Sequence, residues 1–96
     1  MRADEIQEMI EQGRHLIPDY MWGGVSRYMV NRIAPGHFLT ALLSNNLMEA
    51  FARADDLNAD NMRRYVQFLY IYAPSRSFGS AENVREWLNP EPTEES

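Results

Sequence analysis

The residues of this chain that could do acid-base or metal chemistry are few and poorly spaced for it. The two histidines, His15 and His37, stand 22 positions apart and form no spacing that holds a metal ion or pairs a base with a nucleophile. Asp55, Asp56 and Asp60 lie close together, but a calcium loop needs oxygen ligands at alternate positions and a glycine that this segment lacks. Cysteine, phosphate-binding glycine loops and serine-nucleophile motifs are missing from the sequence. We therefore expect no metal site, no cofactor and no enzymatic activity.

The arginines are more informative. All nine basic residues are arginine, whose planar guanidinium suits carboxylate, phosphate and aromatic partners. Four arginines follow an acid by three or four positions, the favourable order for an ion pair within a helix: Glu11–Arg14, Glu49–Arg53, Asp60–Arg64 and Glu82–Arg85. Arg27, Arg32 and Arg76 have no acid at such a spacing, and Arg63 must share one with its neighbour. If the chain recognises an anion, these four are the candidates.

A candidate binding face surrounds Arg27. On a helix, Tyr20, Gly24, Arg27 and Asn31 share one face because they are spaced by four, three and four positions. A phenol and a guanidinium beside a glycine could hold a ring by stacking and an anion by the guanidinium fork. The alternative is a close helix-helix crossing at Gly23-Gly24. The predicted binding residues are Tyr20, Gly24, Arg27, Asn31, Arg63 and Arg76.

These residues must be positioned by short helices. Apolar residues recur at helical spacing in segments separated by glycine, proline, asparagine and aspartate breaks. The expected helices span 4–13, 18–31, 37–43, 47–54, 59–72 and 81–88, with Gly13 as a C-cap and Asn58 and Ser80 as N-caps. The sequence predicts an all-α fold, a single small domain of five or six short helices over residues 1–89 followed by a disordered acidic tail over residues 90–96.

The same spacing predicts which side chains point inward. For the second, fourth and fifth helices these are Met21, Val25, Tyr28 and Met29; Leu47, Ala50, Phe51 and Ala54; and Met62, Val66, Leu69 and Ala73. The helices themselves are too apolar for one small core. The segments 38–51 and 66–72 carry apolar side chains on nearly every side, in a chain with six Met, five Tyr, four Phe and two Trp. We therefore expect a homo-oligomer.

Charge and hydropathy limit the class of protein. The net charge is −5, and the acids gather in the first and last residues, which argues against a nucleic-acid partner. The N-terminal segment lacks the apolar stretch of a signal peptide, and no segment approaches the roughly 18 apolar residues of a membrane span. With no cysteine to form disulfides, the expected location is the cytoplasm, with no membrane contact.

Part of the sequence resembles a known family. The stretches IPDYMWGGVSRYMVNRIAPGHFLTALLSNNLMEAFARADDLN, VQFLYIYAPS and FGSAENVREWL resemble small uncharacterised proteins of tailed phages and prophages, over residues 17–88. Those proteins share a core of the form MWGGV…Y…GHFL…A.L.N.L.EA..RAD. The resemblance implies phage origin and an accessory role in an infected cell. It implies no catalytic residues and no mechanism.

Three functional hypotheses follow. The first is a non-enzymatic phage accessory protein that modulates the host or counters host defence by binding, either sequestering a small anionic nucleotide signal or masking a host protein. The second is an oligomeric protein-protein interaction module without a ligand. The third is a small nucleic-acid-binding regulator, for which the chain offers no lysine and no helix rich in arginine, asparagine and glutamine.

Overall fold

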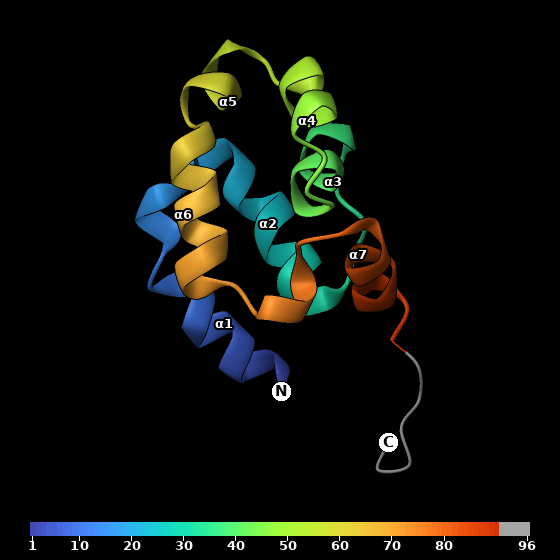
Figure 1. The fold of residues 1–96 in the computed structure, drawn as a ribbon. Helices are drawn as coiled ribbons and strands as arrows, with labels where there is room; N and C mark the ends of the chain where they lie inside the picture. Colours follow the sequence, from blue (N-terminus) through green and yellow to red (C-terminus); the bar gives the residue numbers. More distant parts are fainter. Residues whose placement is uncertain (91–96) are drawn as a thin grey trace.

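The computed structural model describes residues 1–90, and these form helices and loops without a strand, which confirms the predicted all-α fold (Figure 1). The described elements are α1 (Ala3–Glu11), η1 (Arg14–Leu16), α2 (Asp19–Asn31), α3 (His37–Leu43), α4 (Leu47–Arg53), α5 (Asp56–Asp60), α6 (Met62–Tyr72), η2 (Ser75–Ser77) and α7 (Ala81–Leu88), where η denotes a 3₁₀ turn. Residues 1–90 thus hold seven α-helices rather than five or six, because the short helix α5 precedes α6. Apart from Pro90, the predicted acidic tail lies outside the described residues.

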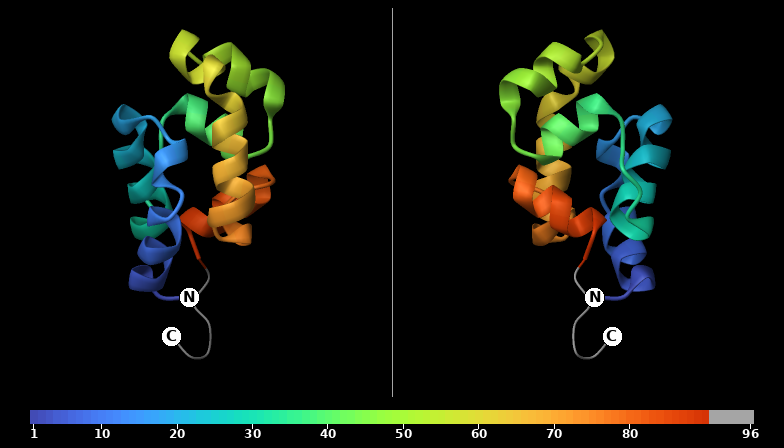
Figure 2. Two further views of the ribbon diagram at one scale, coloured as in Figure 1. Left: turned by 90° about the vertical axis from the view of Figure 1, so that its left-hand side faces the viewer. Right: turned by 90° about the vertical axis from the view of Figure 1, so that its right-hand side faces the viewer.

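The helices surround one core. Helix α1 packs against α2 and α6, α3 packs against α4 and α7, and α6 also contacts η1. Figure 2 shows the α1–α2 pair on one side of the molecule and α6 with α7 on the other. The core side chains come from six of the helices and the turn before α2: Ile6, Ile10, Ile17, Trp22, Val25, Tyr28, Met29, Phe38, Leu39, Ala41, Leu43, Ala50, Met62, Tyr65, Phe68, Leu69, Val84 and Trp87.

Gly13 has a different role from the one predicted. Gly13 has φ −101° and ψ 5°, so it does not adopt the left-handed conformation of a glycine C-cap, and Gln12 ends α1 instead. Gly13 is buried where the rings of Tyr72 and Phe68 come close to the backbone; a Cβ atom there would lie 2.6 Å from Cγ of Tyr72. The absent side chain therefore allows the segment after α1 to pack against α6.

The helix expected over 59–72 does not begin at residue 59. A separate short helix, α5, comes first. Asp55 rather than Asn58 is the N-cap of α5, and the Asp55 carboxylate accepts a hydrogen bond from the backbone N–H of Asn58 at 2.7 Å. The chain breaks again at Asn61 before α6 begins. Asn58 does not cap a helix. Its buried side-chain oxygen instead accepts hydrogen bonds from the hydroxyls of Tyr20 and Tyr65, each at 2.7 Å. By contrast, Ser80 caps α7 as predicted, accepting from the N–H of Asn83.

Three predicted core residues are exposed. Leu47 and Phe51 on α4 and Val66 on α6 leave 60%, 47% and 50% of their surface accessible. Helix α4 has only seven residues and buries Ala50 alone, while α6 turns the stripe containing Tyr65, Phe68 and Leu69 inward. The side chains that these helices leave outside become the margin of a groove.

The predicted ion pairs are partly confirmed. Arg53 Nε contacts Glu49 Oε1 at 2.8 Å, and Arg14 Nη1 lies 3.7 Å from Glu11 Oε1. The pairs expected for Arg64 and Arg85 do not form within residues 1–90. Arg64 instead donates to the carbonyl oxygen of His15, which ties the start of α6 to η1. Arg64 thus forms a hydrogen bond to a residue distant in the sequence rather than an ion pair with the nearby Asp60.

Candidate binding site

The predicted face of α2 is only partly open. Tyr20, Arg27 and Asn31 are exposed, whereas Gly24 is half-buried, and a Cβ atom added there would lie 3.6 Å from Cδ1 of Leu39 on α3. Gly24 therefore lies at the contact between α2 and α3 rather than at the centre of an open surface. Its position fits the helix-helix crossing that the sequence also allowed. The binding role of this face stays a prediction.

The Tyr20 end of that face is acidic. The Tyr20 hydroxyl donates to Oδ1 of Asn58 at 2.7 Å and lies 3.4 Å from Oδ1 of Asp55. Desolvation and the neighbouring Asp55 carboxylate raise the pKa of Tyr20 above its ordinary value. A negative charge placed beside this hydroxyl would be repelled by the same carboxylate, so the environment of Tyr20 disfavours an anionic ligand.

The predicted binding arginines lie on three different elements. Arg27 on α2 folds over the backbone at Gly23, where an added Cβ atom would be 3.0 Å from its Nη1 atom. Arg63 lies in the first turn of α6, and Arg76 lies in η2. All three are exposed and make no hydrogen bond or ion pair with any of residues 1–90. The three arginines are therefore free cations within residues 1–90, but they lie on three separate elements rather than in one segment of the chain.

Arg32, also unpaired in the sequence, belongs to the fold. It ends α2 in the left-handed conformation with φ 61°, and its Nη1 atom donates to the carbonyl oxygen of Trp87 at 2.9 Å. Its guanidinium stacks 3.7 Å from the centre of the Trp87 ring, and the Trp87 indole N–H donates to the carbonyl of Tyr28. Arg32 and Trp87 therefore fasten α2 to α7, and Arg32 is occupied.

Buried hydroxyls near the core have structural partners. The Tyr28 hydroxyl donates to the carbonyl of Ser77 at 2.7 Å, and Tyr65 donates to Asn58. Burial raises the pKa of both tyrosines above the ordinary value, so both stay protonated at neutral pH. A protonated, fully bonded phenol is poorly placed to act as a base or a nucleophile. Residues 1–90 also contain no cluster of three or more side chains suited to hold a metal ion.

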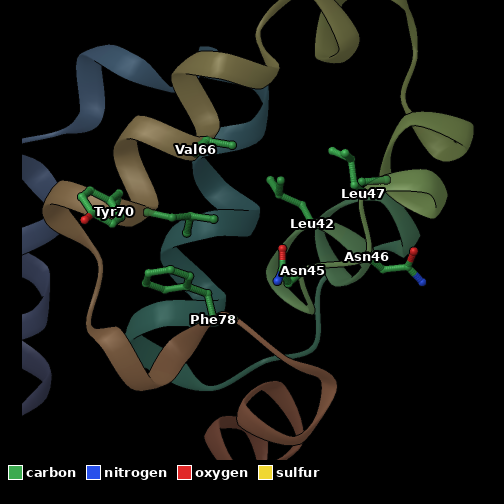
Figure 3. A pocket seen from close by; sticks show the side chains of 10 residues that line it. Leu42, Asn45, Asn46, Leu47, Val66, Tyr70 and Phe78 are labelled. Carbon is green, nitrogen blue, oxygen red and sulfur yellow. The ribbon is translucent and has the colours of Figure 1, made fainter.

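An apolar groove lies between α4 and α6, and the sequence did not predict it. Its volume is about 220 Å³, and Figure 3 shows Val66 and Tyr70 on one side of it and Leu42, Leu47 and the asparagines on the other. The groove is lined by Leu42, Asn45, Asn46, Leu47, Ala50, Val66, Leu69, Tyr70, Phe78 and Gly79, none of which is charged. It therefore presents a hydrocarbon surface edged by amide groups.

Two of the predicted arginines lie close in the chain to residues that line the groove. Arg63 precedes Val66 by three positions and Tyr70 by seven, so it shares the outer face of α6 with both. Arg76 precedes Phe78 by two positions, beyond the opposite end of α6 from Arg63. Neither arginine lines the groove, and the sequence had predicted both as binding residues without placing them beside it.

Comparisons with known proteins give no guide to this site. The chain matches no protein-family model, no curated protein and no solved structure. Among the described residues, none of the helices has the length and apolar character needed to cross a membrane. The fold is that of a small all-α protein with an uncharged, largely apolar groove between α4 and α6.

Proposed function

We propose that this protein is a non-enzymatic phage accessory protein that acts in the cytoplasm of the infected cell by binding and masking a host protein. The motifs over residues 17–88, which resemble those of small phage proteins, motivate the phage setting. The observation that carries the binding role is the uncharged groove between α4 and α6 with exposed apolar side chains along its margin.

The dimensions of the groove favour a protein target over a small molecule. Sites for drug-sized ligands commonly enclose roughly 300–1,000 Å³ and cover most of the ligand. The groove measures about 220 Å³, which suits one or two apolar side chains projecting from a partner surface. Buried aromatic and aliphatic anchors of this kind dominate the energetics of protein-protein interfaces.

The charges support the same choice. A nucleotide signal needs cationic or backbone N–H groups around its phosphates, but no lining residue of the groove is charged. The alternative face on α2 carries one exposed arginine and places Asp55 beside Tyr20. For nucleic acid, the net charge of −5 weighs against the electrostatic attraction on which such binding depends. A protein partner with apolar anchors and a neighbouring acid would complement both the groove and Arg63, which shares a face of α6 with Val66 and Tyr70.

Site-specific crosslinking tests this proposal. A photo-reactive amino acid replaces Tyr70 in the groove margin or, in a matched control, Arg85 on the exposed side of α7. Each variant is expressed in a host cell, and crosslinked products are identified by mass spectrometry. We expect one host protein to be crosslinked from position 70 but not from position 85, and the purified pair to form a complex that Leu47→Glu abolishes. Equal products from both positions, or a complex insensitive to Leu47→Glu, would contradict the proposal.

A further inference from the structure

Large apolar side chains are exposed on the two helices that border the groove. Leu47, Met48 and Phe51 on α4 and Val66 and Tyr70 on α6 are between 47% and 84% exposed. A large side chain covers roughly 150–250 Å² when fully exposed, so together these five leave on the order of 600 Å² accessible. The largest apolar patch on a soluble monomer is commonly about 300–600 Å² and is often functional. An area at the upper end of this range indicates a surface that binds a partner.

We propose that in the free protein this occupant is a second copy of the same chain, paired across a two-fold axis. A two-fold interface brings the same patch of both copies together, so the patch must contain a projecting part and a receiving part. Here the projecting part is the exposed row of Leu47 and Phe51, one turn apart on α4. The receiving part is the groove that Leu47 lines together with Val66 and Tyr70 on α6.

The distribution of charge supports a second copy. Each chain carries a net charge of −5, so two copies repel each other at separations within the screening length of about 8–10 Å. Pairing through a face with no charged lining residue keeps the acids at the periphery. The segment 91–96, EPTEES, has no large apolar side chain with which to fill the groove of its own chain. A second copy supplies apolar side chains without adding buried charge.

The area also approaches the size that a stable dimer buries. A standard specific interface buries about 800 Å² on each partner. The five apolar side chains supply most of this area, and the amide side chains Asn45 and Asn46 at the edge of the groove add polar surface. Fully buried apolar centres with a polar rim are typical of homodimers.

Self-pairing would regulate the function proposed above, and in this respect the inference rests on that function. The same face cannot hold a second copy and a host protein at once. A target must therefore displace one copy, and the apparent affinity for the target falls as the concentration of the phage protein rises. Dilution, or dissociation of the dimer, makes the masking surface available.

Sedimentation equilibrium of the full chain tests the pairing. We expect a dimer for the wild type and, for Tyr70→Glu and Leu47→Glu, dissociation constants at least about 30-fold higher, because the loss of a central anchor weakens an interface by at least that factor. Ile33→Glu is the matched control, since Ile33 is an aliphatic residue 51% exposed in the loop between α2 and α3. It should remain a dimer. Circular dichroism checks that each variant stays folded, as expected for substitutions at exposed positions.

The outcomes separate the two proposals. A wild type that sediments as a monomer at about 100 µM, above typical weak dissociation constants, overturns the pairing; it leaves the crosslinking test of the host target unaffected. A dissociation constant that is unchanged in both groove variants, or one that Ile33→Glu raises as much, also overturns it, because the interface then lies elsewhere. A dimer weakened only in the groove variants supports it, whether or not a host protein is captured.

Discussion

Replacing Gly13 by alanine should destabilise the fold for a purely steric reason. The backbone of Gly13 has φ −101°, which alanine adopts without strain, so only the added methyl group matters. That methyl carbon would lie 2.3 Å from Cδ2 and 2.6 Å from Cγ of Tyr72, and 2.9 Å from Cδ1 of Phe68. Rotation of the Tyr72 ring about its own axis does not move Cγ, so either the side chain or α6 itself must shift. Overpacking of this kind costs about 1–3 kcal/mol, which lowers the melting temperature by roughly 4–20 °C in a domain of this size.

The matched control is Gly24→Ala. Its methyl carbon would lie 3.6 Å from Cδ1 of Leu39, an ordinary contact, and it would replace a glycine inside α2. Alanine is favoured over glycine in a helix interior by about 0.8–1 kcal/mol, so this variant should melt several degrees above the wild type. Thermal unfolding followed by circular dichroism measures both changes. If Gly13→Ala has the same melting temperature as the wild type, or Gly24→Ala melts at a temperature as low as Gly13→Ala, the described packing of Gly13 against α6 and of Gly24 against α3 is incorrect.

Three further predictions address the arginines and the buried tyrosines. Arg27→Ala should bind the proposed host protein with wild-type affinity in calorimetry, whereas Arg63→Ala should weaken it; a loss of about 1.5–3 kcal/mol for Arg27→Ala would return the site to α2. Arg32→Ala should lower the free energy of unfolding by about 1–3 kcal/mol through loss of its stacking and its hydrogen bond, and Arg32→Lys should not restore it, because an ammonium cannot reproduce the planar contact. Burial raises the pKa of Tyr28 and Tyr65 in the folded state. The free energy of unfolding should therefore be constant with respect to these groups below pH about 10 and fall above it, by up to about 1.4 kcal/mol per pH unit for each tyrosine. Urea unfolding between pH 8 and 11 should show a shallower decline in Tyr28→Phe and Tyr65→Phe than in the wild type.

The positions of most helices could be predicted from the sequence because their ends depend on neighbouring residues. Proline, glycine and a serine cap fix the ends of α2, α3 and α7 with little help from the rest of the fold. The prediction failed at Asn58, whose side chain is occupied by two tyrosine hydroxyls that the sequence places 38 and 7 positions away. A residue suited to a cap was taken by a tertiary contact, and Asp55 capped the helix instead.

The candidate site was harder to predict because it depends on the orientation of whole helices. Spacing shows that Leu47, Phe51 and Val66 share faces with core residues, but a short helix buries a narrow stripe, and which stripe it buries is set by its neighbours. The partners of Arg32 and Arg64 lie 55 and 49 positions away in the chain, so the sequence could not show that Arg32 is occupied or that Arg64 binds a carbonyl oxygen in place of Asp60. It could show that Arg27 and Arg76 lack local acids and that Arg63 shares one with Arg64, and these three arginines remain free within residues 1–90.

Part of the apolar excess noted in the sequence lies on the outer face of α6, outside the core. A chain of this length has one core, and α6 fills its share with Tyr65, Phe68 and Leu69, so Tyr70 at 84% exposure contributes almost nothing to folding. Substituting Tyr70 should therefore leave the melting temperature within about a degree or two of the wild type, since exposed positions usually change stability by less than about 0.5 kcal/mol. Binding through the α4–α6 groove would be lost in the same variant. In the proposed arrangement, folding and binding use different faces of α6, and a substitution on the outer face can separate them.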